Sequence, residues 1–546
     1  MKLFPMKSGQ ARVLIAQAGA ALAVAVLMSG CGDNYRPVVI PIATNGPAAQ
    51  PTSYAVVVSS TGPSTPGVVT IIDYSGDSVM TEAPIGPGPR DFTLNSVGVL
   101  GYTVNSDGTI SNFGITTALQ AKNVSFSTLP STAEPVNFMA PSVGLWAADR
   151  YGDFVDLFSG SPEAFHLAIP VSTSGSPATM PVFIAGSPAV PAQREYVLSQ
   201  NVPDNAPMAC NLSPTSAPAG VAVPIEIRNS TADTAIAVGR CPVYAVESSD
   251  LQRLFVLNRG DDTITVINTN KNALDQCPVP LTTVPPSSVP TCPPPYNTNQ
   301  NGQPITYHPV LPLSTAALTA ANAPPNCNMT TNPSCGMGAI AGPVYAEYNA
   351  ATQQLVVANY DGGAISVIDV SLDEYGNDSA SFGTTYTIPV GNTATPNPAS
   401  VTVLFDGSKA YTANQNDDSG TGNGTVTVVN LSTHTVENTL TVVGHPRQVV
   451  STQNSEFSKV YVASPDSPYI TIIESTPTET DVIDTTVLVE GTVVDVRTTT
   501  QDGSSRSNNN YSSRAPGYGQ PCNLSPSSMV STYGANYTLD NCQAVP

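Results

Sequence analysis

The chain has 546 residues, of which only 11% are charged, and its 19 basic and 40 acidic residues give a formal net charge of −21. Nucleic-acid binding and adhesion to anionic lipid headgroups both depend on basic surfaces, so this charge argues against both functions. With 41 glycines, 51 prolines and few aromatic residues apart from 21 tyrosines, the composition is typical of a turn-rich all-β protein.

Residues 1–31 have the features of an export signal. Three basic residues, Lys2, Lys7 and Arg12, precede an apolar run that is too short and too rich in alanine to favour a membrane span. The run ends in Leu-Met-Ser-Gly-Cys, closing at Cys31, and this sequence resembles the lipobox of bacterial lipoproteins. The resemblance implies that Cys31 carries a lipid that holds the protein in the bacterial cell envelope, facing the periplasm or the cell surface. An ordinary cleaved signal peptide with a chance cysteine is the alternative.

Residues 32–53 are rich in Pro, Ala, Asn and Thr without periodicity, which predicts a flexible tether. The eight cysteines other than Cys31 lie in an exported chain, where disulfides are favoured. Their eight positions allow about 105 pairings. Neighbouring cysteines suggest the pairs Cys210–Cys241, Cys277–Cys292, Cys327–Cys335 and Cys522–Cys542. No CxxC spacing occurs and no histidine lies close to a pair, so we expect no metal site at these cysteines.

The segment Leu355–Val370, with the sequence LVVANYDGGAISVIDV, predicts a β-hairpin, because its Asp and Gly residues tolerate the positive φ of a tight turn. The same pattern returns along residues 54–503 at intervals that suit four-stranded propeller blades, except for one long interval. In each of the eight units a small polar residue ends the strand before the turn: Ser59, Asn105, Asp149, Ser199, Asn258, Asn359, Asn414 and Ser464.

These strands are apolar on both faces, so a neighbouring sheet must cover each face, as in a ring of stacked blades. The first unit lacks an opening strand, and a spare strand-forming run follows the last unit at Val493–Arg497. We therefore expect the C-terminal strand to complete the first blade and close the ring. Eight blades are favoured. Seven blades are the alternative, if the repeat has been placed in the wrong phase at the divergent units near Trp146 or Tyr196.

The repeats LFVLNRGDDTITVIN from Leu254 and LVVANYDGGAISVID from Leu355 resemble the YVTN-type β-propeller repeats of exported bacterial and archaeal proteins. The resemblance is clear in the later units and poor around Phe138–Arg194. It implies a propeller, typically of seven blades, and it implies no single activity.

Two regions interrupt the repeats. Residues 272–343 contain proline runs and four cysteines, which predicts a disulfide-held loop insertion on one blade. Residues 504–546 begin with Ser, Asn and Gly and contain Cys522 and Cys542, which predicts a disulfide-stapled tail.

No pattern in the sequence indicates a catalytic site. His166, His308, His434 and His445 fall in separate units or in the insertion, and no GxSxG motif is present. The acidic corner from Asn414 to Gly424 offers hard oxygen ligands, so Ca²⁺ is a conceivable cofactor, although a solvated hairpin loop explains the corner better. If the turn residues face the central channel, a polar ring would form from Asn105, Asp149, Asn258, Asn359 and Asn414.

The sequence thus predicts a monomeric, lipid-anchored envelope propeller that acts as a binding or scaffold module for a protein or a glycan and carries no catalytic residue. The alternative is a propeller hydrolase or lactonase that holds a divalent cation in its channel, as some propeller lactonases do.

Overall fold

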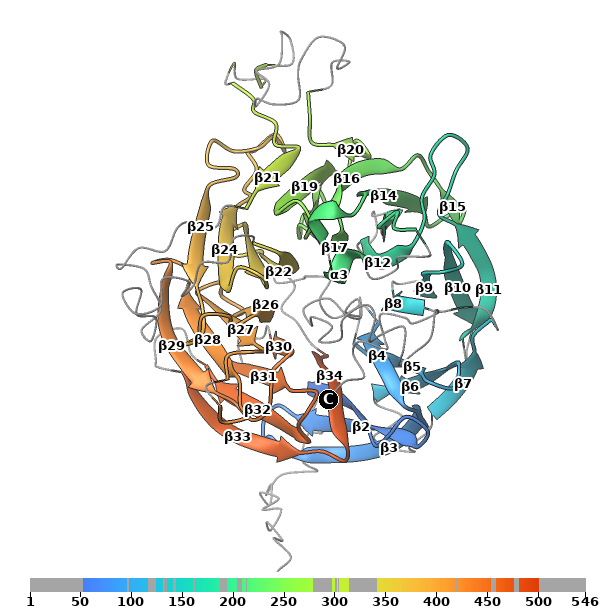
Figure 1. Ribbon diagram of the computed structural model, residues 1–546, viewed down its shortest axis with the longest axis vertical. Helices are drawn as coiled ribbons and strands as arrows, with labels where there is room; N and C mark the ends of the chain where they lie inside the picture. Colours follow the sequence, from blue (N-terminus) through green and yellow to red (C-terminus); the bar gives the residue numbers. More distant parts are fainter. Residues whose placement is uncertain are drawn as a thin grey trace, which may run out of the picture. The chain divides into compact units, whose positions relative to one another are not determined.

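The protein is an eight-bladed β-propeller (Figure 1). The computed structural model describes residues 53–95, 98–115, 124–130, 133, 135–140, 144–160, 163–186, 194–203, 209–212, 214–277, 297–299, 302, 304–313, 341–418, 420–452, 458–475 and 481–499. Within these ranges the strands form eight antiparallel sheets, and the first strand of each sheet lies nearest the centre of the ring. The predicted all-β class and the count of eight blades are both confirmed.

The strands of the first four blades follow the chain, apart from the first strand of blade 1, which comes from the end of the propeller. Blade 1 contains β34 (Thr492–Thr498), β1 (Tyr54–Ser60), β2 (Pro66–Asp73) and β3 (Val79–Pro87). Blade 2 contains β4 (Pro89–Leu94), β5 (Leu100–Asn105), β6 (Thr109–Gly114) and β7 (Val124–Thr128). Blade 3 contains β8 (Pro135–Met139), β9 (Leu145–Asp149), β10 (Phe154–Gly160) and β11 (Glu163–Pro170). Blade 4 contains β12 (Pro181–Gly186), β13 (Arg194–Ser199), β14 (Ala219–Glu226), β15 (Thr231–Ala232) and β16 (Ile236–Arg240).

In blades 4 and 5 two short strands share the outermost position. Blade 5 contains β17 (Pro242–Glu247), β18 (Arg253–Asn258), β19 (Thr263–Asn268), β20 (Ala273–Leu274) and β21 (Val310–Pro312). Blade 6 contains β22 (Pro343–Asn349), β23 (Gln354–Asn359), β24 (Ala364–Asp369) and β25 (Thr385–Pro389). Blade 7 contains β26 (Pro398–Val403), β27 (Lys409–Asn414), β28 (Thr425–Asn430) and β29 (Thr435–Thr441). Blade 8 contains β30 (Gln448–Ser451), β31 (Lys459–Ala463), β32 (Tyr469–Glu474) and β33 (Val482–Leu488).

Two short helical segments lie in one loop of blade 4. Between β13 and β14 lie the short helix α3 (Ala209–Leu212) and the 3₁₀ turn η1 (Pro214–Ser216). Among the described residues no helix has the length and apolar character needed to cross a membrane.

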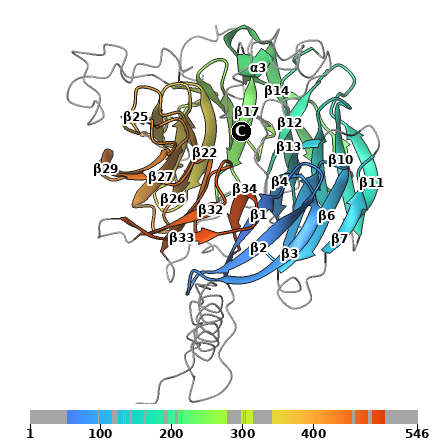
Figure 2. The ribbon, with the colours of Figure 1, turned by 60° about the horizontal axis from the view of Figure 1, so that its bottom comes forward.

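The ring closes through strands from opposite ends of the propeller. β34 pairs antiparallel with β1, with Val496 opposite Val57 and Thr492 opposite Ser60 (Figure 2). A β-bulge interrupts the pairing next to Ser59. The predicted closure by the C-terminal strand is therefore confirmed.

The two apolar faces of each strand pack on two different neighbouring blades, as β1 illustrates. Ala55 and Val57 belong to a core shared with blade 8, which includes Tyr461. The alternate residues Val56 and Val58 belong to a core shared with blade 2. Successive side chains of a strand point to opposite faces, so this alternation buries both sides of the sheet.

Because β34 closes the ring, we expect its buried side chains to contribute to the stability of the protein. Val496 has no exposed surface, whereas Val494 on the same strand is half-buried. We expect Val496→Ala to lower the free energy of unfolding by about 2 to 3 kcal/mol, because it removes buried methyl groups and leaves a cavity. Denaturant unfolding measures the change, and Val494→Ala is the matched control. Equal losses for the two variants would contradict the packing described for β34.

Candidate functional site

The predicted ring residues are used mainly inside their own blades. The buried amides of four of them donate hydrogen bonds to Ser or Thr hydroxyls on the next strand. These bonds run from Asn105 to Thr109 and Ser111 (2.9 Å each), from Asn258 to Thr263 (3.1 Å) and Thr265 (2.9 Å), from Asn359 to Ser366 (2.8 Å), and from Asn414 to Thr425 (3.0 Å) and Thr427 (2.8 Å). We call the residue that ends the strand before each turn the corner residue of its blade. The amides of these four corner residues hold the end of that strand against the following strand.

Blade 3 departs from this pattern. Asp149 replaces the corner asparagine, and Asp156 takes the place that Thr265 has in blade 5, since both lie opposite the residue two positions before the corner. Asp156 is buried. Burial, with a further contribution from the Asp149 carboxylate, raises the pKa of Asp156 to about 7. Two carboxyl groups thus occupy a place where other blades have an amide and a hydroxyl.

A second acidic pair lies between blades 4 and 5. Glu195 on β13 stands where blade 5 has the apolar Leu254, and it has room because Gly186 lies opposite: a Cβ at Gly186 would lie 1.9 Å from Glu195 Oε2. Glu195 is fully buried, and burial together with the Glu247 carboxylate raises its pKa well above the ordinary value. Burial, and secondarily Asp250, raises the pKa of Glu247 to about 8. Glu247 therefore favours the protonated form at neutral pH.

Large side chains from several blades meet at the centre of the ring. The ring centroids of Phe183 and Tyr244 are 4.6 Å apart, and those of Tyr244 and Tyr345 are also 4.6 Å apart. Gln448 of blade 8 donates to the Tyr345 hydroxyl of blade 6 at 3.4 Å, which spans two blades that are not neighbours. The buried Arg497 of β34 donates to Asp495 at 2.9 Å. Aromatic contacts therefore join the inner strands of blades 4, 5 and 6, and one hydrogen bond joins those of blades 6 and 8.

The insertion forms a polar pocket where it folds onto blades 5 and 6. We call this the insertion pocket; it has a volume of about 150 Å³. It is lined by Gln252, Arg253, Asn268, Asn270, Lys271, Asp275, Ile305, Thr306, Tyr307, Tyr375, Gly376, Asn377 and Asp378. The described part of the insertion reaches this place because β20 and β21 both pair with β19.

A buried ionic network forms the floor of the insertion pocket. Arg253 Nη2 lies 3.0 Å from Asp378 Oδ1 and 3.4 Å from Asp275 Oδ1. His308 Nδ1 lies 2.7 Å from Asp378 Oδ2, and the His308 backbone N–H donates to Asp275 at 3.1 Å. Burial and the neighbouring Asp378 raise the pKa of Asp275. The network connects blade 5, the insertion and blade 6, which fixes the walls of the pocket.

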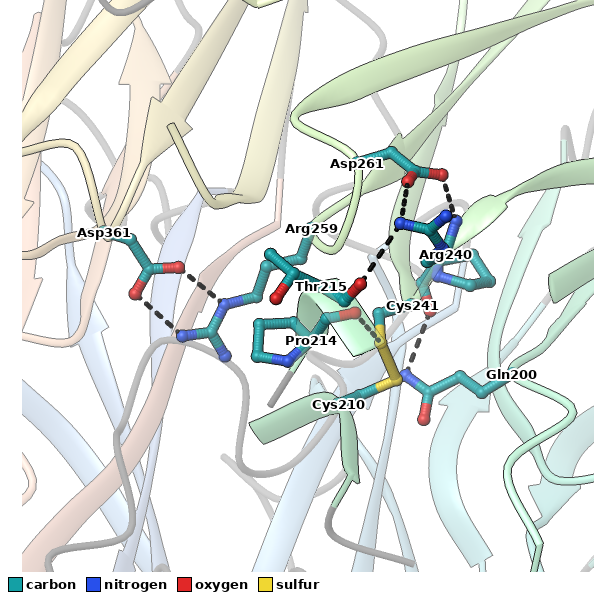
Figure 3. The surroundings of a disulfide bond; sticks show 10 residues. Gln200, Cys210, Pro214, Thr215, Arg240, Cys241, Arg259, Asp261 and Asp361 are labelled. Carbon is teal, nitrogen blue, oxygen red and sulfur yellow. Dashed lines mark hydrogen bonds and ion pairs between the residues drawn. A yellow bond between two sulfur atoms is a disulfide. The ribbon is translucent and has the colours of Figure 1, made fainter. Parts of the chain in front are cut away.

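The structure contains the disulfide Cys210–Cys241, with a Cα–Cα distance of 5.4 Å. It ties the loop that carries α3 and η1 to the start of blade 5, where Arg240 Nη1 also donates to the Thr215 carbonyl at 3.1 Å (Figure 3). Cys277 is disulfide-bonded as well. The remaining predicted positions lie outside the described residues: Cys31, Cys292, Cys327, Cys335, Cys522 and Cys542.

The carboxylates of the acidic corner are engaged by neighbouring hydrogen-bond donors. Asp417 accepts from the backbone N–H of Asn392 at 2.8 Å, and Asp418 accepts from those of Gly420 and Gly422 at 2.8 and 2.9 Å. Hydrogen bonding to the charged form, above all from the Thr421 N–H, lowers the pKa of Asp418. In the described part of the chain no group of three or more His, Cys, Asp or Glu is arranged to hold a metal ion. Calcium binding stays a prediction.

Sequence reasoning missed the insertion pocket and both acidic pairs. One signal was available: the acidic Glu247 ends the otherwise apolar opening strand β17 (Pro242–Glu247). The insertion pocket had no such signal, because its residues come from three segments far apart in the chain.

Comparisons with known proteins support the fold and nothing finer. No family model matches the sequence, and no curated protein matches it. Among solved structures, the dihydro-heme d1 dehydrogenase NirN is 13% identical with a TM-score of 0.50, over 82% of this chain and 75% of that chain. AztD from Citrobacter koseri is 12% identical with a TM-score of 0.47, over 82% and 98% of the two chains. A putative 6-phosphogluconolactonase from Bacteroides fragilis is 13% identical with a TM-score of 0.45, over 83% and 99%.

The buried acids predict a pH-dependent stability. The folded state holds a proton on Glu247 up to about pH 8, whereas an unfolded glutamate releases it near pH 4.5, so stability should fall as the pH rises between these values. We expect Glu247→Gln to reduce this slope by up to about 1.4 kcal/mol per pH unit. Unfolding free energies between pH 5 and 9 measure it. The exposed Glu474→Gln is the control, and an unchanged slope in Glu247→Gln would contradict the assignment.

Proposed function

We propose that this protein is a lipid-anchored β-propeller of the bacterial envelope that binds a glycan in the insertion pocket. The observation that carries the proposal is the chemistry of that pocket. It is an open polar site with fixed walls, placed where a long insertion departs from the regular blades. Binding residues are commonly found on loops that a rigid scaffold positions.

The lining groups suit a polyhydroxylated ligand. Gln252, Asn268 and Asn270 carry amides, which both donate and accept hydrogen bonds as sugar hydroxyls do. Tyr307 and Tyr375 add aromatic rings with a polar end, and Tyr375 is 39% exposed. A volume of about 150 Å³ suits a single sugar ring, so the pocket would take a terminal or branching residue of a longer glycan.

The same geometry favours a binding module over the alternative of a cation-dependent hydrolase or lactonase. That alternative relies on the corner residues as oxygen ligands in the channel. The Nδ2 groups of Asn105, Asn258 and Asn414 hold these amides against the next strand of their own blades. Among the described residues, the Oδ1 atoms of Asn258 and Asn414 have no hydrogen-bond partner. In the described part of the chain, no group of three or more His, Cys, Asp or Glu side chains is arranged to hold a metal ion, so the support for a channel cation is weaker than that for the insertion pocket.

Glycan binding is tested with variants of the insertion pocket. Asn270 is exposed at the pocket, and the Lys271 ammonium lies 5.6 Å from the centre of the Tyr307 ring. We expect Asn270→Ala and Lys271→Met each to weaken binding about 5- to 10-fold, which is the value of one or two hydrogen bonds. An array of envelope and host glycans identifies the ligand, and calorimetric titration measures the affinity.

The matched control is Asn229→Ala, because Asn229 is an exposed amide on a turn of blade 4 and is not one of the lining residues. A protein that binds no glycan on the array, or that loses as much affinity with Asn229→Ala as with Asn270→Ala, would overturn the proposal.

The lipid anchor is tested separately. In a bacterial host supplied with an alkyne fatty acid, we expect the wild-type chain to become labelled and to fractionate with membranes. Cys31→Ser should abolish the label, because the thiol is the acylated atom in the lipobox resemblance. Cys522→Ser should keep it. A labelled Cys31→Ser variant would disprove anchoring at Cys31.

A further inference from the structure

We call the junction between two neighbouring blades a seam. The seam between blades 3 and 4 and the seam between blades 5 and 6 are built alike, but they differ in one carboxylate. Arg150 directly follows the corner residue Asp149 of blade 3, and Arg259 directly follows the corner residue Asn258 of blade 5. Each arginine lies where its blade meets the next one. Both are buried, with 1% and 4% of their surface exposed.

At the seam between blades 5 and 6 the arginine has a carboxylate partner. Arg259 Nε and Nη2 donate to the two oxygens of Asp361, both at 2.9 Å (Figure 3). In the same seam Asp262 Oδ1 accepts from the Gly342 N–H at 2.8 Å. A bidentate pair of this kind fixes the plane of the guanidinium and compensates its charge.

The backbone of the seam between blades 3 and 4 repeats this arrangement. Asp153 is equivalent to Asp262, and its Oδ1 accepts a hydrogen bond from the Met180 N–H at 2.7 Å. Met180 takes the part of Gly342, and both have a φ of 58°. Asn201, however, stands two residues beyond the corner, as Asp361 does in blade 6. Its Oδ1 accepts from the Thr179 N–H at 3.0 Å and its Nδ2 donates to the Ala219 carbonyl at 3.2 Å.

Within the part of the chain that the structure describes, Arg150 therefore has no carboxylate in the place where Arg259 has Asp361. Among the described residues, its Nε, Nη1 and Nη2 have no hydrogen-bond partner. The Arg150 Cζ lies 5.9 Å from the centre of the Tyr151 ring. A buried guanidinium without a counter-charge is strongly unfavourable, and an anion of the right shape would offset that cost.

We propose that Arg150 forms a binding site for a small carboxylate, which would occupy the position that the Asp361 side chain occupies beside Arg259. The ligand class follows from the equivalent seam, where a planar, singly charged carboxylate meets the fork of the arginine. Because Arg150 is only 1% exposed, the ligand must be small, of the size of formate or acetate. The acidic Asp149 directly before Arg150 disfavours a dianion such as sulfate. This inference is independent of the insertion pocket.

The test measures thermal unfolding of the full-length protein in chloride-free buffer at constant ionic strength. Sodium acetate and sodium formate are the probes, and sodium sulfate is the comparison. For the wild type we expect the midpoint to rise by about 2 °C or more as acetate increases, because the ligand binds only the folded state. Sulfate should give a smaller rise. A sulfate response equal to the acetate response would overturn the assignment of a carboxylate.

Two variants localise the effect. Arg150→Met should abolish the acetate response. The matched variant Arg259→Met should lower the midpoint without ligand, because it leaves Asp361 unpaired, and should keep the acetate response. An acetate response that survives in Arg150→Met, or a wild type without any response, overturns the proposal. If Arg150→Met does not fold, calorimetric titration of the wild type with acetate decides: binding of one acetate per chain supports the site, and no binding overturns it.

Discussion

Every sheet of this protein has two apolar faces, and neither face can be left to water. Residues 55 and 57 of β1 pack on blade 8, while residues 56 and 58 pack on blade 2, and the same alternation recurs around the ring. A blade is therefore stable only between two neighbours, and the first and last blades obtain theirs only when the ring closes. The pairing of β34 with β1 satisfies this requirement, because it fixes the two ends of the repeat array to each other.

The closed ring also creates the environment of its buried charges. The arginine–aspartate pair at Arg497 and Asp495 lies on the closing strand and is covered from all sides. The unusual carboxyl groups Asp156, Glu195 and Glu247 lie in the consecutive blades 3, 4 and 5, where burial raises each pKa. These blades also contain Arg150. One arc of the ring thus departs from the apolar repeat, whereas the insertion pocket lies in the next seam, between blades 5 and 6.

The sequence was sufficient to predict the ring because its signals repeat. The corner column from Ser59 to Ser464, the two apolar faces and the spare strand at Val493 together predicted eight blades and their closure. The candidate sites could not be predicted in the same way. The Asp149–Asp156 contact depends on the register across a hairpin, and the room for Glu195 depends on Gly186 of the opposite strand. The insertion pocket needs Arg253, Tyr307 and Asp378 to meet from three separate segments, which no local pattern encodes.

The position of β34 has a consequence for biosynthesis. The strand that completes blade 1 is the last strand of the propeller to be made, so β1 must wait with one edge unpaired until nearly the whole array has been synthesised. Pairing of segments so distant in the chain carries a high loop-closure cost and is slow. A chain truncated before Thr492 would keep an open edge and two uncovered apolar faces. Such chains are prone to aggregate and to be degraded. Only chains that contain β34 can close the ring, so closure would select for complete molecules.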